Sequence, residues 1–467
     1  MIGVIGIILS LGLLMYLAYR GVTVLILAPV LALFAALMGS FGGQQIPLMA
    51  TYTEVFMKAL AGYIKSYFPV FLLGAIFGKI MDDSGAAKAI SHAIAKKLGK
   101  EKAIIAVVLS CGVLTYGGVS LFVVAFAVYP IACALFREAG IPKRLIPGSI
   151  ALGSFTFTMT ALPGTPQIQN AIPMPFFGTN AYAAPVLGIV AGIVMGGGGL
   201  AWLMYRAKKA MAAGEGYGNH AKDKVVEFNE SELPSFTVAM VPIILVLAIN
   251  FILSRMVFVA GKYNGDYLTQ APYSTKLASV AGTWSLVISL VIAIISVIIL
   301  NYKRFKEVTV INSLNQGAFG SLLAILNTAA EVGYGNVIQS LAAFEIVKIA
   351  ILGISSNPII SEAISVNILA GITGSASGGM SIALGTLGKT YYDLALQQGI
   401  NPEVLHRIAA LACGGLDTLP HNGAVITLLS ICGLTHKESY VDIGMVSVII
   451  PIAGTVIAIL LAMMGIV

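Results

Sequence analysis

Two long apolar stretches of the chain are interrupted in the same way, 257 residues apart. The first stretch contains Leu162-Pro163 and the second contains Leu419-Pro420, and small, amide or hydroxyl residues follow each pair. A glycine-rich break precedes each stretch at the same offset, so that Gly117 corresponds to Gly374. Proline and glycine interrupt helices. Helices broken at corresponding places in two halves are typical of secondary transporters, in which the breaks form the substrate site.

The composition places the chain in a membrane. It is 58% hydrophobic and 10% charged, with a mean hydropathy of +0.93, whereas a soluble protein has about 25% charged residues. Runs such as 186–205 and 280–300 approach the roughly 20 apolar residues that cross the hydrocarbon core. The sequence therefore predicts an all-α polytopic membrane protein.

The formal net charge of +7 comes from basic residues that cluster in short loops between apolar runs, for example around 96–102, 137–144, 206–209 and 303–306. Basic short loops face the cytoplasm. The charge therefore reports orientation in the bilayer, and we expect no nucleic-acid partner. The four cysteines all lie in apolar segments without metal-ligand spacing, which favours a packing role: Cys111, Cys133, Cys413 and Cys432.

Placing these loops in the cytoplasm predicts two inverted repeats. Residues 103–135 begin and end at basic clusters and have a glycine-rich centre, so we expect a re-entrant hairpin that enters from the cytoplasm. The second half starts on the opposite side, so its hairpin is expected to enter from outside. The predicted division is N-terminal scaffold helices (1–51), a first repeat (52–205; hairpin 103–135, broken helix 145–180), a cytoplasmic linker (206–235), further scaffold helices (236–311) and a second repeat (312–467; hairpin 362–388, broken helix 405–433).

The ends of broken helices supply the expected binding groups. A helix N-terminus leaves backbone N–H groups unpaired and carries about half a positive charge, which suits an anion such as a carboxylate. No arginine falls inside the breaks of either repeat, so the site would hold a carboxylate without an arginine side chain. The candidate substrate-binding residues lie in or beside the four breaks: Thr115, Gly117, Gly118, Ser120, Thr165, Gln167, Asn170, Thr373, Ser375, Ser377, Thr418 and Asn422. Taken singly, each of these could equally be a helix-packing glycine or a hydroxyl bonded to its own backbone.

Three ionisable residues are expected at membrane depth, where a charge costs about 2.5–3.5 kcal/mol. Asp417 and His421 flank the second Leu-Pro break, and Glu331 lies in an otherwise uncharged stretch. We interpret them as candidates for taking up a coupling proton or helping to bind a coupling cation; a structural Asp–His or Asp–backbone bond that stabilises the kink is the alternative. Glu345 and Lys348 are expected on the polar face of an interfacial helix. The sequence assigns no role to His92, His406 or His436.

Enzymatic chemistry has no support in the sequence. It contains no recognisable nucleophile with its base, no metal-ligand spacing and no phosphate-binding loop, since the four glycines at 196–199 are not followed by Lys-Ser. We therefore expect no catalytic residues, no metal and no cofactor. A channel or a membrane-embedded enzyme is the rival class to a transporter.

The chain resembles the gluconate permease (GntP) family of the ion-transporter superfamily. The likeness rests on TYGGVSLFVVAFAVYPIA, AGIPKRLIPGSIALGSFTFTMTALPGTPQIQN and LACGGLDTLPHNGAVITLL, and it extends over essentially the whole chain. The resemblance implies a proton-linked importer of small hydroxylated carboxylates in the bacterial inner membrane, with Na⁺ as the alternative coupling ion. It also implies a homodimer whose scaffold domain holds the interface while an elevator-type transport domain moves.

One stretch departs from the sugar-acid members of that family. Those members carry a PPHPGP stretch at the first broken helix, whereas this chain has LPGTPQIQN, which lacks the histidine. Leu162, Pro163, Ile168 and Leu419 would give a more apolar site. The chain therefore looks closer to the hydroxybutyrate-type branch, with 3-hydroxybutyrate as the favoured substrate and a sugar acid or another carboxylate as alternatives.

Overall fold

The structure is a computed structural model that describes all residues except 1, 21, 44, 221–232, 260 and 306–308. The regular secondary structure of the described residues is helical, with no strand among them, which confirms the all-α prediction. The helices of the first half are α1 (Ile2–Tyr19), α2 (Val24–Phe41), α3 (Leu48–Ala50), α4 (Met57–Asp83), α5 (Ala86–Leu98), α6 (Ala103–Tyr116), α7 (Leu121–Ala139), α8 (Ile146–Ser154), α9 (Phe157–Thr160), α10 (Ile168–Ala171), α11 (Pro173–Phe177) and α12 (Pro185–Ala212).

The second half has fewer short helices. They are α13 (Phe236–Ile252), α14 (Leu277–Asn301), α15 (Val310–Ser340), α16 (Phe344–Leu352), α17 (Pro358–Thr373), α18 (Ala376–Gln397), α19 (Pro402–Ala412), α20 (Gly423–Cys432), α21 (His436–Gly444) and α22 (Ile450–Met463). Short π-helical segments extend three of the helices: Thr51–Phe56 before α4, Leu253–Val257 after α13 and Met445–Ile449 before α22. Within the described residues, six helical segments are long and apolar enough to cross a membrane.

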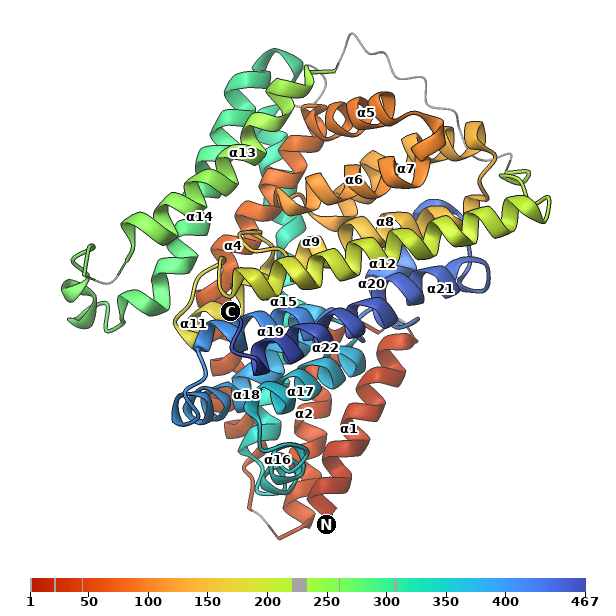
Figure 1. The fold of residues 1–467 in the computed structure, drawn as a ribbon. Coiled ribbons are helices and arrows are strands. Elements are labelled where there is room, and N and C mark those ends of the chain that lie inside the picture. The colour runs from red at the N-terminus through yellow and green to blue at the C-terminus, as the bar shows by residue number, and fades with distance from the viewer. Residues whose placement is uncertain (1, 21, 44, 221–232, 260, 306–308) are drawn as a thin grey trace.

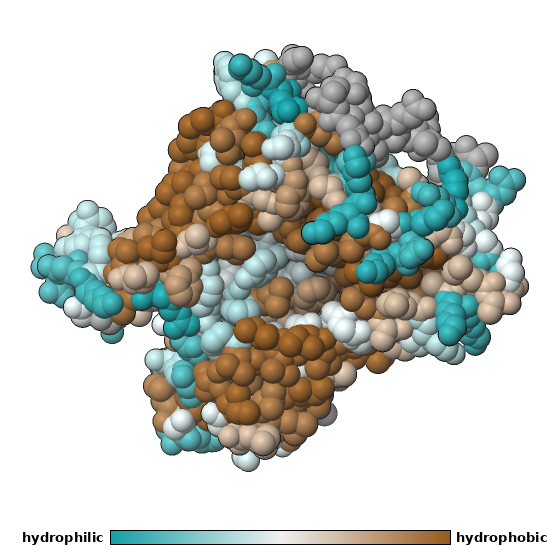
Figure 2. Space-filling view, turned by 45° about the horizontal axis from the view of Figure 1, so that its top comes forward, coloured by the Kyte–Doolittle hydropathy of each residue, from teal (hydrophilic) through white to brown (hydrophobic). Residues whose placement is uncertain are grey.

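The long helices α4 and α15 pack together (Figure 1), and both contribute side chains to two hydrophobic cores. An ideal Cβ on Gly317 of α15 would lie 2.7 Å from Ile76 Cα of α4, so the glycine permits this close approach. One core is built mainly from α5–α8, α13 and α14, and the other from α1, α2 and α17–α19. Figure 2 shows two large hydrophobic surfaces separated by a more polar band. The candidate site lies where α4 and α15 pass between these cores.

Two helix pairs turn sharply at glycine-rich segments. The helices α6 and α7 meet at residues 117–120, and α17 and α18 meet at Gly374-Ser375. The second pair extends beyond the predicted range of 362–388. Asn357 caps its first helix by accepting from Ile359 N, Pro358 occupies the first helical position, and Gly399 (φ +68°) follows its last turn.

Two further apolar stretches are broken helices. In the first, α8 and α9 are separated from α10 and α11 by residues 161–167. In the second, α19 ends at Ala412 and α20 begins at Gly423. Helix α19 begins at Pro402, three residues before the predicted start, because Asn401 accepts a bond from Glu403 N and the proline follows it.

The predicted linker differs from the structure at its start. Helix α12 continues through Arg206 to Ala212 and ends before Gly214, which has φ +77°. Alanine, lysine and arginine are good helix formers, so a charged composition here does not end the helix. Residues 221–232 of the predicted linker lie outside the described residues.

A buried carboxylate joins α21, α12 and the short segment Lys143–Leu145 at the basic end of α12. Asp442 of α21 has a side chain that is 1% exposed. Its Oδ1 accepts from Arg206 Nε (2.8 Å) and Trp202 Nε1 (3.0 Å), and its Oδ2 accepts from an Arg144 guanidinium nitrogen (3.1 Å). Arg144 also donates to Glu215 (2.7 Å), which lowers the pKa of that carboxyl. These contacts hold the end of the first half against the last helices of the second.

We expect Asp442→Asn to destabilise the protein by about 1.5–3 kcal/mol, because the substitution removes charge-assisted bonds from two arginines to a buried group. The unfolding midpoint of the purified protein in detergent measures this loss. Asp393→Asn is the control, because the Asp393–Lys389 pair is exposed and is worth about 0–1 kcal/mol. Equal midpoints for the two variants would contradict a stabilising role for the bonds between Asp442 and the two arginines.

Candidate substrate cavity

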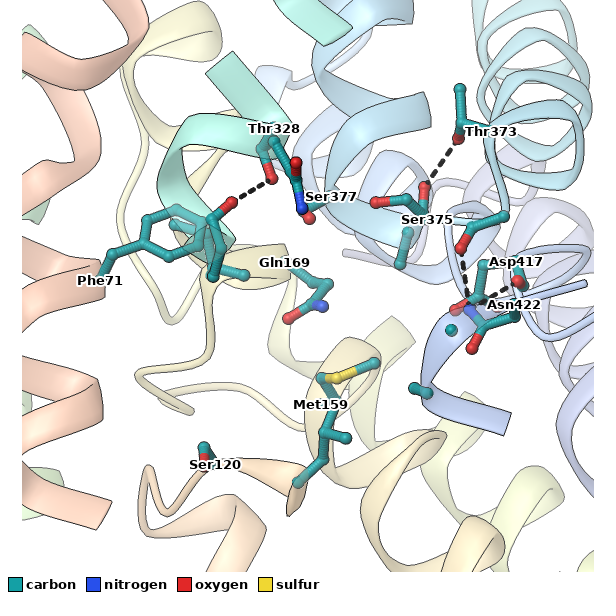
Figure 3. A pocket seen from close by; sticks show the side chains of 18 of the residues that line it. Phe71, Ser120, Met159, Gln169, Thr328, Thr373, Ser375, Ser377, Asp417 and Asn422 are labelled. Carbon is teal, nitrogen blue, oxygen red and sulfur yellow. Dashed lines mark hydrogen bonds between the residues drawn. The ribbon is translucent and has the colours of Figure 1, made fainter. Parts of the chain in front are cut away.

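One cavity of ≈ 670 Å³ lies between the two cores, and all four helix breaks reach it (Figure 3). Its walls come from the turn between α6 and α7, the turn between α17 and α18, and the breaks before α10 and α20, with α4 and α15 alongside. Segments that are far apart in the sequence therefore share one space. A volume in the range of 300–1,000 Å³ is typical of small-molecule sites.

The turn between α6 and α7 is held by the first broken helix. Gln167 Nε2 donates to the carbonyls of Thr115 (2.8 Å) and Val119 (3.3 Å). Gly118 has φ +99°, and an ideal Cβ there would lie 2.8 Å from Pro166 Cγ, so only glycine fits this position. The Ser120 side chain is half-buried and lines the cavity.

The turn between α17 and α18 is held by the second broken helix in the corresponding way. Asn422 Nδ2 donates to Gly374 O (2.9 Å) and to Asp417 O (2.9 Å). The Ser375 hydroxyl accepts from Gly378 N (3.0 Å), and the Thr373 hydroxyl donates to Ser375 O (3.2 Å). Figure 3 shows these side chains together on one side of the cavity, with Ser120 across from them.

Three helices of at least ten residues begin at the cavity wall. Helix α7 starts after Ser120, α18 after Ser375 and α20 after Asn422. Ser375 and Asn422 each cap one N–H of their own helix, whereas Ser120 makes no side-chain cap bond. The first N–H groups of a helix have no intrahelical partner. The cavity wall therefore presents several uncommitted N–H donors and three positive helix ends.

Two carboxylates also line the cavity. Glu331 and Asp417 are each 4% exposed, and Glu331 Oε2 and Asp417 Oδ1 have no hydrogen-bond partner within the described structure. His421 lies beside Gly374, and its Nε2 is likewise unpaired in the part of the chain described. The described residues that line the cavity include no lysine or arginine. The cavity thus combines positive helix ends with ionisable groups, but its described lining has no lysine or arginine to pair with an anion.

The cavity opens at the surface along α15. Gly320 and Ala324 are exposed, Asn327 is half-buried, and Glu331 lies at the buried end of the same helical face. Residues beside the turn between α1 and α2 also line this opening, and Thr23 Oγ1 donates to Asn327 Oδ1 (3.3 Å). The opening therefore leads from the surface to the two carboxylates.

Most of the candidate residues line the cavity: Gly118, Ser120, Gln167, Glu331, Thr373, Ser375, Ser377, Asp417, Thr418, His421 and Asn422. Four lie outside it: Thr115, Gly117, Thr165 and Asn170. Thr115 is fully buried. Gly117 faces Ile243, and an ideal Cβ on Gly117 would lie 2.7 Å from the Ile243 side chain. Thr165 is also buried, and its hydroxyl lies 3.5 Å from Gln167 N.

Asn170 belongs to a buried hydrogen-bond cluster behind the first break. Its side-chain amide donates to Thr165 O and Ala181 O (2.9 Å each), and its Oδ1 accepts from His406 Nε2 and from Arg407 (3.1 Å each). Asn170 thus holds the shape of the break, and its side chain is fully occupied by these partners.

No arginine lies inside the breaks, but one supports the first break from a neighbouring helix. Arg407 of α19 is fully buried and donates to the carbonyl of Thr160, which adjoins the first break, and to those of Ala181 and Ala183 in the loop before α12. The residue was visible in the sequence within the predicted range 405–433, but its contacts are more than 200 residues away. His406, to which the sequence assigned no role, contacts Thr179 Oγ1 through Nδ1 (2.6 Å).

The sequence analysis also missed cavity residues that come from unbroken helices. Asn327 and Thr328 lie on the cavity face of α15, and Phe71 lies on that of α4. Gln169 and Met159 belong to the first broken helix. The polar residues at positions 321, 327, 328 and 331 of α15 were the sequence pattern from which this cavity face could have been predicted.

The profile described as GntP family permease matches residues 1–464. The chain is 45% identical over 459 residues to the transporter YxjC of Bacillus subtilis, with 95% of each chain covered. It is 27% identical over 394 residues to a permease of Haemophilus influenzae, covering 82% of this chain and 77% of the relative.

Two solved transporter structures share the fold at 14% sequence identity. The YdaH transporter of Alcanivorax borkumensis aligns with a TM-score of 0.59 over 88% of each chain. MtrF of Neisseria gonorrhoeae aligns with a TM-score of 0.54 over 92% of this chain and 93% of that one. At this identity the likeness concerns the fold alone.

Proposed function

The chain belongs to the GntP permease family and is a multi-pass membrane transporter, and from this premise we propose that it carries a small hydroxycarboxylate together with protons. Its relatives are transporters and permeases, as expected for a protein that is not an enzyme. The favoured substrate is a short monocarboxylate of the 3-hydroxybutyrate type. The bacterial inner membrane is the proposed location.

The convergence of four helix breaks on one cavity carries this proposal. Irregular backbone at membrane depth is tolerated where it is buried or lines a wet cavity, and transporters use it to bind substrate. Here Gln167 and Asn422 each bond the turn of a different hairpin, so the two halves build their parts of the site alike. This likeness supports two inverted repeats, 52–205 and 312–467, as the architecture.

The cavity wall suits both ends of a hydroxycarboxylate. The free N–H groups at the start of α7, α18 and α20 suit a carboxylate, as helix N-termini suit anions. Ser377 and Ser120 offer hydroxyls to the substrate hydroxyl, while Phe71 and Met159 offer apolar surface to a short carbon chain. A gluconate-like sugar acid, which needs more hydrogen-bond partners, is the second candidate, followed by other carboxylates.

The same proposal extends to assembly and movement. We expect a homodimer in which scaffold helices within 1–51 and 236–311 hold the interface. The two hairpins and two broken helices would then move as an elevator-type transport domain. Na⁺ in place of H⁺ is the alternative coupling ion.

Proteoliposomes test the proposed function directly. We expect saturable exchange of internal unlabelled for external labelled 3-hydroxybutyrate, and accumulation driven by an inward proton gradient. A parallel assay with labelled gluconate distinguishes the two leading substrates. A conductance that does not saturate, together with no exchange of labelled substrate, would instead indicate a channel. Accumulation that follows a sodium gradient at equal pH would show that Na⁺, and not H⁺, is the coupling ion.

A further inference from the structure

The cavity is acidic where an anionic substrate must bind. Its described lining contains two carboxyl groups, one histidine, and no lysine or arginine. Each carboxyl group has an unpaired oxygen and is 4% exposed. If both were charged, a carboxylate substrate would become the third negative charge in one partly dehydrated space. The helix ends supply only about half a positive charge each.

Glu331 occupies the place that an anion would use at α18. The carboxyl group rests against Gly378, in the first turn of that helix, so closely that any Cβ at this position would overlap it. The helix end that could stabilise a substrate carboxylate is therefore already next to Glu331. The other ionisable group from a facing helix is Tyr63 of α4, whose side chain is buried. Tyr63 cannot supply a positive charge.

Asp417 has no cationic partner either. The ionisable groups around it are Cys413 and His421 on the same segment and Tyr440 of α21. Tyr440 donates its hydroxyl proton to Thr418 O (3.0 Å), so it is occupied. His421 is the one group here that could become positive. Its half-buried ring lies against Gly374 with Nε2 unpaired in the described structure, so no carboxylate is bonded to this nitrogen.

We propose that each monocarboxylate anion is carried with two protons, one on Glu331 and one on Asp417, so that every cycle moves one net positive charge. This inference rests on the proposed function and deepens it. Protonation makes the cavity lining neutral and frees the first turn of α18 for the substrate. Loss of the protons on the other side restores two negative charges, which repel the bound anion. Substrate and protons therefore leave together.

The reversal potential measures the number of protons. Proteoliposomes are loaded with a tenfold excess of labelled 3-hydroxybutyrate inside, at equal pH on both sides and without sodium, and potassium gradients with valinomycin set the voltage. One net charge per cycle predicts that net flux vanishes at about −59 mV inside. Single-proton symport is electroneutral, so outward flux would persist at every voltage. Three protons would place the reversal near −30 mV.

Two variants assign the protons to residues. Glu331→Gln and Asp417→Asn should each remove one proton, so that flux becomes independent of voltage while labelled substrate still exchanges. Glu345→Gln is the matched control, because Glu345 is exposed and paired with Lys348; it should keep the reversal near −59 mV. An unchanged reversal potential in Glu331→Gln or Asp417→Asn overturns the assignment to that residue.

The wild-type result separates the two proposals. Exchange of 3-hydroxybutyrate or gluconate with voltage-independent flux would overturn the two-proton inference and leave the carboxylate transporter standing. Exchange of neither compound would overturn the proposed function, and the inference with it. The wild-type measurement decides the stoichiometry even where a variant does not fold.

Discussion

Replacing Gly378 by alanine should reduce substrate uptake by about 100-fold, the effect of misplacing a binding group by about 1 Å. A methyl group at this position overlaps the Glu331 carboxyl group, and α18 is anchored by the bond from Gly378 N to Ser375. Either Glu331 or the start of α18 must therefore move away from the cavity. Initial uptake of labelled 3-hydroxybutyrate into proteoliposomes, normalised to reconstituted protein, measures the loss.

Gly385→Ala is the matched control for this substitution. Gly385 lies two turns further along α18, and an ideal Cβ there would be 3.9 Å from Asn336 Nδ2, an ordinary contact. Its uptake should stay within about twofold of wild type, since surface-like substitutions cost under about 0.5 kcal/mol. Equal activity of the two alanine variants would show that Glu331 does not need its place against Gly378.

Replacing Arg407 by methionine should lower the stability of the protein by about 2–6 kcal/mol. Methionine fills similar space but has no donor, and it leaves the buried carbonyls of Thr160 and Ala183 without the bonds that Arg407 gives them. Each buried group left unsatisfied costs about 1–3 kcal/mol. Asn170 is less affected because His406 still donates to its Oδ1.

The four cysteines provide the readout for this prediction. All four are buried, so a thiol-reactive fluorescent dye that reaches them on unfolding reports the unfolding midpoint in detergent. Lys389→Met serves as the control, because that side chain is 87% exposed, and its midpoint should not change measurably. A midpoint for Arg407→Met equal to that of the control would mean that Arg407 does not support the first break.

The helix interruptions could be predicted because their causes are local. Glycine and proline act on the backbone within a few residues, so TYGGVS marks the end of α6 at Tyr116 and Leu-Pro marks the breaks before α10 and α20. Apolar length likewise predicts membrane helices. These two signals were enough for the all-α architecture and for the segments that line the cavity.

The partners of buried polar residues could not be predicted, because they depend on packing between distant segments. Asn170 was a reasonable candidate for substrate binding by its position, yet Arg407 and His406 occupy it from 237 and 236 residues away. The partners of Asp442 could not be predicted for the same reason, since both of its arginines come from the first half. A single sequence gives the kind of group and its depth, but not the side chain that faces it.

The bonds from Arg407 and His406 to the first break limit how the protein can change shape. They tie α19, which precedes the second break, to the loop around Asn170. Sliding one broken helix past the other would expose an arginine and several carbonyls to hydrocarbon. We therefore expect the two broken helices to keep a fixed relative position throughout the cycle, as one mechanical unit. The freedom needed for alternating access is then left to the contacts of that unit with α4 and α15.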